Sequence, residues 1–179
     1  GHVDGQVGTS REVWRLGLET LAWERLPDLT HARSSHACCV VRGGTLAALG
    51  GFVHPEGTST ISASVEVLER GSEAWRELPP LSCGGRTDFA AVAVEESGSV
   101  EGQVCILGGS DAEWRPTDEV HLVDLATGAC TPQPRLRIPR MAFLLARLHD
   151  GRIVVALSLI HIRRCRRSTL CRSRRSPSH

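Results

Sequence analysis

The densest group of side chains able to do chemistry lies in THARSSHACC, which runs from Thr30 to Cys39. Its two histidines and two cysteines, His31, His36, Cys38 and Cys39, are the residue types that bind zinc or form a Cys/His nucleophile, provided they converge on one point. Cys38 and Cys39 are adjacent, so in a strand they face opposite sides. No third group that would orient an imidazole is evident. The segment is therefore predicted to pack in the interior, without a metal site or catalytic residue.

Three arginines recur at a nearly constant interval: Arg33, Arg86 and Arg140, at steps of 53 and 54 residues. A guanidinium can bind a carboxylate through two parallel hydrogen bonds. At equivalent positions of successive units, these residues would form a basic rim that binds acidic side chains of a partner. The alternative is equally physical: each arginine pairs with an Asp or Glu of its neighbouring unit and stabilises the turn. The sequence leaves both roles open.

Four further residues are candidate binding residues because they occupy loop positions that the repeat does not require. An aromatic side chain in a loop is of the kind enriched at the energetic centre of protein interfaces, which singles out Trp114 in SDAEWRPTDE. The full set of irregular candidates is His54, Asp88, Asp111 and Trp114.

The elements that position these residues follow from an internal repeat. VWRLGLETLAWERLP from Val13, VEVLERGSEAWRELPP from Val65 and VHLVDLATGACTPQP from Val120 align at steps of 52 and 55. Trp23, Trp75 and Cys130 stand ten residues into these segments. A first and a second apolar strand follow each repeated arginine, and two of the second strands end in Gly-Gly, at Gly51 and Gly109.

Each unit is predicted to form four short strands. SVEVLE and EVHLVDL alternate with period two, whereas LAALGG and VCILGG are almost continuously apolar, as expected of strands covered on both faces. A single sheet of this kind cannot bury both faces, so neighbouring sheets must stack around an axis. The sequence predicts an all-β fold, a β-propeller of four-stranded antiparallel blades, with Trp23 and Trp75 filling the space between blades.

These landmarks resemble the kelch repeat. LGG at Leu49–Gly51 and Leu107–Gly109 is similar to its diglycine, and VEVLERGSEAW and VHLVDLATGAC resemble its third and fourth strands. The resemblance covers Val13 to Ala156. It implies a partial kelch propeller at 13–156: the outer two strands of one blade, two full blades, and the first two strands of a fourth. Residues 1–12 are expected to be the N-terminal end of the fragment.

The resemblance implies a protein-interaction module, a scaffold or substrate-recognition propeller that binds a peptide or protein through loops at one end of its channel. The alternative is part of a kelch-type enzyme, a sugar-acid isomerase or lyase, with catalytic residues on other blades. A copper radical oxidase needs tyrosines, which the sequence lacks. A ubiquitin-ligase adaptor would need a flanking BTB or F-box domain.

Charge and cysteine content set further expectations. Residues 1–156 carry 14 arginines against all 20 acidic residues, a net charge of −6, so no nucleic-acid footprint is expected there. No apolar run reaches the length of a membrane span. The seven cysteines are irregularly spaced without a CxxC pair, which favours reduced thiols, a cytoplasmic location and no cofactor.

The last segment, 157–179, differs from the rest by carrying seven arginines and no acidic residue. LSLIHI followed by RRCRR, and the closing CRSRRSPSH, resemble translated adapter sequence of transposon-made sequencing libraries. This segment begins where the third second-strand should reach its glycines, so 157–179 is predicted to be a non-native, disordered tail. The alternatives are a basic targeting patch and a metal site formed by His161, Cys165, Cys171 and His179.

Overall fold

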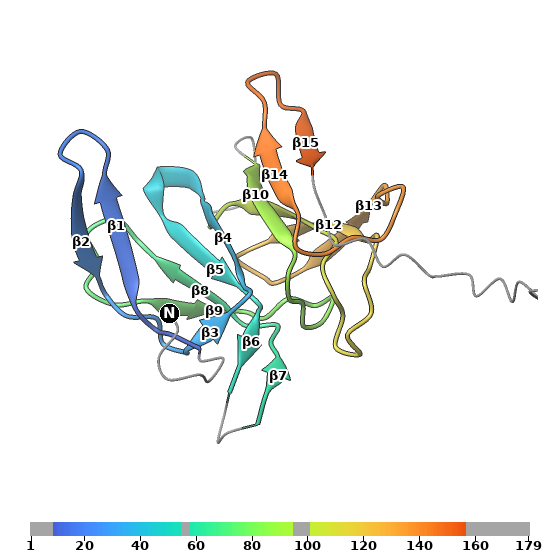
Figure 1. Cartoon of the computed structure of the whole chain (residues 1–179), viewed down its shortest axis with the longest axis horizontal. Coiled ribbons are helices and arrows are strands. Elements are labelled where there is room, and N and C mark those ends of the chain that lie inside the picture. The colour runs from blue at the N-terminus through green and yellow to red at the C-terminus, as the bar shows by residue number, and fades with distance from the viewer. Residues whose placement is uncertain (1–8, 55–57, 95–100, 157–179) are drawn as a thin grey trace, which may run out of the picture.

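The described part of the chain is built from short antiparallel strands. The computed structural model describes residues 9–54, 58–94 and 101–156, and in these ranges the one helical element is a 3₁₀ turn at Arg42–Gly44 (Figure 1). Strands joined by tight turns to their sequence neighbours give sheets in chain order, as the alternating apolar pattern predicts. The predicted all-β fold of four-stranded antiparallel sheets is confirmed.

The first four-stranded sheet has the order β4-β5-β8-β9. Its strands are β4 (Ala37–Val40), β5 (Leu46–Leu49), β8 (Val65–Leu68) and β9 (Arg76–Leu78). β5 and β8 pair antiparallel from Leu49↔Val65 to Leu46↔Leu68. Every residue of β8 is buried, including Glu66, so this strand is covered on both faces.

The second four-stranded sheet repeats the first, with the order β10-β11-β12-β13. Its strands are β10 (Ala90–Val94), β11 (Gln103–Leu107), β12 (Val120–Asp124) and β13 (Cys130–Gln133). The pairing Leu107↔Val120 corresponds to Leu49↔Val65 in the first sheet. The sequence repeat is therefore a structural repeat with the same register.

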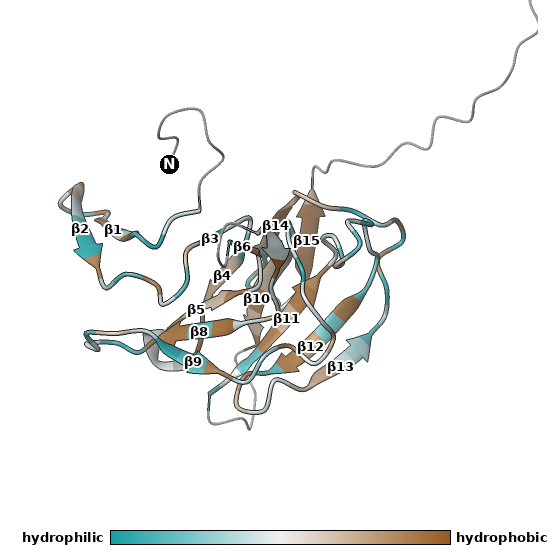
Figure 2. Cartoon of the chain, turned by 90° about the horizontal axis from the view of Figure 1, so that it is seen from below, coloured by the Kyte–Doolittle hydropathy of each residue, from teal (hydrophilic) through white to brown (hydrophobic). Residues whose placement is uncertain are grey.

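A half-sheet lies at each end of this row. β1 (Val13–Gly17) pairs only with β2 (Ala22–Leu26), and β14 (Leu144–Arg147) only with β15 (Ile153–Ala156) among the described strands. By the sequence alignment, β1–β2 is an outer half, equivalent to β8–β9, and β14–β15 is an inner half, equivalent to β4–β5. β1–β2 lies beyond the first sheet, away from β14–β15 (Figures 1 and 2).

A small additional sheet was not predicted and is made by the loops. β3 (Arg33–Ser34), β6 (Phe52–Val53) and β7 (Thr60–Ile61) pair in the order β3-β6-β7. Its register, Arg33↔Val53 and Ser34↔Phe52, joins the connection before the first sheet to the loop after its glycine pair. The bridge Thr87↔Ser110 does the same in the second sheet. Both kinds of loop therefore lie together at one end of the sheets.

The core lies between the two four-stranded sheets. The innermost strands β4 and β10 lie side by side, and β14 lies beside β10. The buried cluster takes residues from both sheets: Ala37, Val41, Ala47, Leu49, Val65, Val67, Leu81, Phe89, Val104, Ile106, Val123 and Leu125. Figure 2 shows hydrophobic residues along β11 and β15 and hydrophilic residues along β2.

The glycine pairs are where neighbouring sheets approach most closely. Gly50 N and Gly51 N donate to Ser64 O and Arg86 O, so the doublet joins its own sheet to the next connection. A Cβ on Gly109, which has φ +89°, would lie 2.5 Å from Phe89 Cβ and 2.6 Å from Thr87 O. Only a residue without a side chain fits this contact.

The two tryptophans predicted to fill the space between blades differ. Trp75 is half-buried, and its indole Nε1 donates to Pro27 O at 2.8 Å, which ties the first sheet to the preceding repeat. Trp23 is 65% exposed, so its predicted place in the core is wrong for the described chain. The preceding repeat contacts Trp75, whereas no sheet precedes β1–β2 among the described residues to cover Trp23.

The described residues include no helix with the length and apolarity needed to span a membrane. The predicted adapter-like tail, 157–179, and residues 1–8 of the predicted N-terminal end lie outside the described residues.

The glycine contact predicts a selective effect of added side chains. Gly109→Ala is expected to lower the free energy of unfolding by about 3 kcal/mol or more, because it combines a left-handed φ with overlap against backbone atoms. Gly43→Ala is the matched control: φ is +75°, yet nothing lies within 4 Å of its Cβ, so about 1 kcal/mol is expected. Urea unfolding of both variants measures the difference, and equal losses would contradict the close-contact role.

Candidate protein-interaction surface

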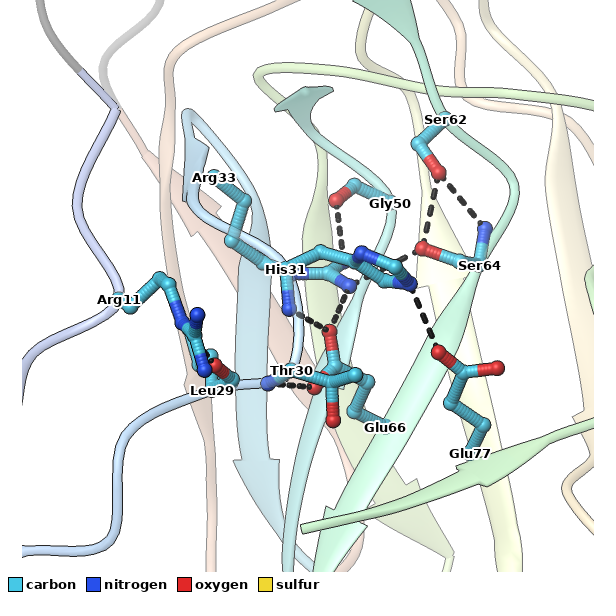
Figure 3. A network of polar contacts seen from close by, with 10 residues as sticks. All are labelled: Arg11, Leu29, Thr30, His31, Arg33, Gly50, Ser62, Ser64, Glu66 and Glu77. Carbon is cyan, nitrogen blue, oxygen red and sulfur yellow. Dashed lines mark hydrogen bonds and ion pairs between the residues drawn. The ribbon is translucent and has the colours of Figure 1, made fainter. Parts of the chain in front are cut away.

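Arg33 is the centre of a buried polar network (Figure 3). Its guanidinium forms an ion pair with Glu66, and both side chains are 0% exposed. Nη1 donates to Gly50 O at 2.7 Å and Nη2 to Ser64 Oγ at 3.0 Å. Arg33 thus joins β8 to the glycine pair that follows β5, within one sheet.

The Glu66 carboxylate also holds the chain that enters this sheet. It accepts a hydrogen bond from Thr30 N at 2.7 Å and one from His31 N at 3.3 Å. The His31 ring lies outside the buried network, with Nε2 2.7 Å from Glu77 Oε1 (Figure 3). A buried carboxylate is stable only when charged and hydrogen-bonding partners surround it, and here both kinds are present.

The second sheet repeats this network with the acid in another position. Arg86 donates to Gly108 O at 3.2 Å and forms an ion pair with Glu119. Glu119 precedes Val120, as Ser64 precedes Val65, whereas His121 occupies the position of Glu66. Burial, followed by the charge of Arg86, lowers the pKa of His121. A neutral imidazole therefore stands where the first sheet has its carboxylate.

Arg140 is the third member of the series and is half-buried. Its backbone forms the same hydrogen bond as those of the other two arginines. Arg140 N donates to Thr117 O, as Arg33 N donates to Ser10 O and Arg86 N to Ser62 O. Its side chain has no carboxylate partner among the residues that the structure describes, and its Nε is buried without a hydrogen bond there.

The sequence left two roles open for the repeated arginines, a basic rim for a partner or an internal ion pair. At Arg33 and Arg86 the structure shows the internal ion pair. Their side chains are 0% and 3% exposed and are directed at carboxylates and glycine carbonyls of their own sheets. These two guanidinium groups are therefore not part of a basic rim, because they are buried. The free-energy cost of removing them from water is offset by their carboxylate and carbonyl partners. The partner is an acid of the same sheet, not of the adjacent one.

The prediction that the His31–Cys39 segment packs in the interior is only partly correct. His36 and Cys39 are half-buried, whereas His31 and Cys38 are exposed. Side chains of β4 alternate in burial, so Cys38 and Cys39 do not converge. No group of three metal-ligating side chains is found in the described ranges. Burial raises the pKa of Cys39 to about 12. Burial and the nearby Arg33 charge lower the pKa of His36 to about 4. At neutral pH this segment therefore contains a neutral imidazole and a protonated thiol.

The loop after the second glycine pair presents an aromatic surface. Trp114 is 62% exposed and has φ +61°, a conformation that is costly for a bulky residue. Its ring stacks on Phe52, with centroids 4.7 Å apart and planes at 24°. Phe52 directly follows the first glycine pair. The aromatic surface, Phe52 and Trp114, thus joins corresponding loops of two neighbouring sheets.

Asp111 is a structural residue of this loop. Its Oδ1 accepts hydrogen bonds from Glu113 N at 3.0 Å and Arg115 N at 2.9 Å, and its Oδ2 lies 3.1 Å from Arg115 Nε. Trp114 N in turn donates to Asp111 O. The strained backbone of Trp114 is thereby held in place, so the indole is presented in a preformed orientation.

The remaining predicted binding residues lie near this surface or at the axis. His54 is exposed and directly follows β6, the strand of Phe52. Asp88 belongs to a backbone ladder between successive sheets: Asp88 N donates to Ser35 O, and Ala142 N to Asp88 O. All three residues of the ladder have φ near +50°. The ladder lies beside the innermost strands. Each of its residues stands two positions after one of the repeated arginines, and only this spacing could have predicted the ladder from the sequence.

The fold and its repeated contacts define a class of protein: all-β, with antiparallel four-stranded sheets of the kelch-blade kind. Over 120 residues the chain is 28% identical to Kelch-like protein 34 of Homo sapiens, a match covering 67% of this chain. That match spans 16% of the length of the human protein. No protein-family model matches the chain.

The buried ion pair predicts a large effect from removal of one charge. Glu66→Gln is expected to lower the free energy of unfolding by about 3 kcal/mol, because it leaves the Arg33 charge uncompensated in the interior. Glu24→Gln removes the acid of an exposed cross-strand pair with Arg15, and should cost at most about 1 kcal/mol. Denaturant unfolding at pH 7 compares them. Similar losses would show that the buried network contributes no more than a surface pair.

His36 predicts a defined dependence of stability on pH. Its pKa is about 4 in the folded chain and 6.5 ordinarily, so the unfolded chain binds the proton more readily. This contribution is complete above pH 6.5 and is lost as the pH falls toward 4, by up to about 3 kcal/mol. His36→Gln should flatten the loss between pH 7 and pH 4.5, and His149→Gln, at an exposed site, should not. An unchanged slope in His36→Gln would contradict the assignment.

Proposed function

We propose that the chain is a protein-interaction module, a scaffold or substrate-recognition propeller, which binds a peptide or protein partner through the aromatic surface of Phe52 and Trp114. The observation that carries the proposal is that a largely exposed tryptophan is held at a positive φ by a turn built around Asp111. A protein maintains strain of this kind where a function depends on the geometry.

The chemistry of the surface supports a partner with an apolar or aromatic side chain. Trp and Phe supply large contact areas with few rotatable bonds, so little entropy is lost when a partner binds. The charged residues beside the indole are already satisfied, because Arg115 contacts both Asp111 and Glu113. Apolar burial on the stacked rings is thus the principal source of affinity, with exposed His54 at the border.

The same proposal includes a cytoplasmic setting without a cofactor and without catalysis. The cytoplasmic setting has chemical support, because the cysteines in the described ranges are free thiols, which persist in a reducing compartment. The acidic balance of residues 1–156 disfavours binding to nucleic acid or to an anionic membrane surface.

The proposal predicts that binding and stability separate at Trp114. Trp114→Ala should remove binding of the partners captured by the wild-type chain, at least tenfold by quantitative pull-down. It should lower the free energy of unfolding by only about 1 kcal/mol, the value of one aromatic pair. Leu18→Ala alters another exposed apolar side chain, in the β1–β2 turn, and should leave capture unchanged. Equal capture by Trp114→Ala and wild type would overturn the proposal.

A further inference from the structure

Two cysteines from distant parts of the chain meet where the first sheet joins the second. Cys83 lies in the connection between β9 and β10, and Cys130 is the first residue of β13. Ser82, the neighbour of Cys83, is bonded to this strand and to the turn before it. Cys130 N donates to Ser82 Oγ at 2.9 Å, and Ser82 N donates to Gly128 O at 2.9 Å. The connection is thereby held against the β12–β13 turn.

The backbone fixes both cysteines at this junction. Ser82 and Cys83 are the central residues of a turn that Gly84 N closes by donating to Leu81 O at 3.1 Å. On the other side, Gly128 has φ +71°, and a Cβ there would lie 2.2 Å from Pro80 O. The close approach of the two backbones therefore does not depend on the cysteine side chains.

The two sulfur atoms contact each other. The Cys83 S–H donates a hydrogen bond to the Cys130 sulfur. Both side chains are half-buried and pack against the edge of the core cluster. The thiols are thus held together by the fold and are still accessible to a small solute.

Among the described repeats, cysteine stands at both of these positions only at this junction. Cys130 occupies the place of a tryptophan in the first two repeats. Cys83 corresponds to His31 and Ile138, because each of the three stands two residues after a leucine whose N–H donates to the carbonyl two residues before the preceding outer strand pair. The repeat requires cysteine at neither position, yet both changes fall on side chains that touch.

The surroundings of Cys130 favour its thiolate, the reactive form of a cysteine. The hydrogen bond from Cys83 is the largest cause of the lowered pKa of Cys130. Burial opposes this shift, and Cys83 N and the Ser82 side chain add to it. The same contact, together with burial, raises the pKa of Cys83, and the positive charge of Arg86 acts against that rise. The pair therefore loses its first proton from Cys130, while Cys83 stays protonated as the donor.

We propose that Cys83 and Cys130 are a redox-sensitive pair, which hydrogen peroxide oxidises to a disulfide and glutathione reduces again. Cys130 is the attacking residue and Cys83 the resolving one. An accessible thiolate beside a second cysteine is the arrangement that peroxide oxidises reversibly. The bond would fasten the connection that enters the second sheet to the outer strand of that sheet.

The reaction has two steps. The Cys130 thiolate attacks one oxygen of hydrogen peroxide and the O–O bond breaks, which gives a sulfenic acid and a hydroxide that takes up the proton released by Cys130. Cys83 then attacks the sulfenic sulfur, the S–O bond breaks, and the departing hydroxide takes the Cys83 proton. The two thiols together lose two electrons, and the peroxide is reduced to two molecules of water.

The contact also explains why Cys83 reacts second. Its pKa is raised first of all by the hydrogen bond to Cys130, and this cause disappears once Cys130 is a neutral sulfenic acid. The charge of Arg86 then favours the Cys83 thiolate without opposition from a neighbouring anion. Reduction follows the ordinary exchange, in which one glutathione thiolate opens the disulfide and a second releases the protein thiol as glutathione disulfide.

The first test identifies the bond in the whole, reduced 179-residue chain. After reaction with an equimolar amount of hydrogen peroxide, alkylation with N-ethylmaleimide should leave two of the seven cysteines unlabelled. Digestion with trypsin and Glu-C, which separates Cys105 from Cys130, should yield a peptide pair joined through Cys83 and Cys130. Glutathione should then restore labelling of both. The proposal is overturned if this crosslink is absent after the peroxide is consumed, or if glutathione does not remove it.

The second test separates the roles of the two cysteines. Cys130→Ser should react with peroxide about tenfold more slowly than the wild type, because the attacking thiolate is gone. Cys83→Ser keeps a hydroxyl donor beside Cys130, so it should react at close to the wild-type rate and retain a sulfenic acid at Cys130 that dimedone labels. Peroxide consumption at the wild-type rate in Cys130→Ser would overturn the assigned roles.

A matched control and a control for folding complete the design. Cys105→Ser removes another half-buried thiol, on β11, whose pKa is raised by burial, and it should form the Cys83–Cys130 bond as the wild type does. In guanidinium chloride the preference for this pair should be lost, because only the fold brings the two sulfurs together. If Cys130→Ser does not fold, by far-UV circular dichroism, the dimedone label in Cys83→Ser decides, and its absence from Cys130 overturns the proposal.

Discussion

The rest of the structure depends on the close approach of neighbouring sheets at the glycine pairs. Gly51 N and Gly109 N donate to the carbonyls of Arg86 and Arg140, the arginines that enter the next repeat. The side chain of Arg86 then folds back over its own sheet to bind Gly108 O and Glu119, as that of Arg33 binds Gly50 O and Glu66 in the first sheet. A side chain at the glycines would separate neighbouring sheets and break this backbone hydrogen bond. Arg86 therefore has two roles in one interaction unit: its carbonyl joins its sheet to the preceding one, and its side chain forms the ion pair within its own sheet.

This unit tolerates a change in which residue supplies the negative charge. The first sheet has Ser64 and Glu66, and the second has Glu119 and His121, at the same two positions. In both, the guanidinium obtains one carboxylate and the second position remains uncharged at neutral pH. What the fold preserves is the charge balance around a buried guanidinium, since an uncompensated charge there is unstable. The identity of the acidic position is free to vary.

Much of the fold was predictable because its signals are local and repeated. The period-two pattern of SVEVLE, the glycine pairs and the spacing of the arginines together predict four strands per unit. The prediction that Trp114 occupies an exposed loop position was also correct, and it was possible because nothing in the repeat requires an aromatic residue there. These features follow from strand geometry and from the repeat alone.

The rest depended on contacts between distant residues. The sequence placed Trp23 in the core because it matches Trp75, but burial requires a neighbouring sheet, and none covers it in the described chain. The stacking of Phe52 on Trp114 links residues 62 positions apart, and only the adjacency of a phenylalanine to a glycine pair could have indicated it. The choice of Glu66 over an acid of the adjacent sheet likewise depends on the path of the Arg33 side chain.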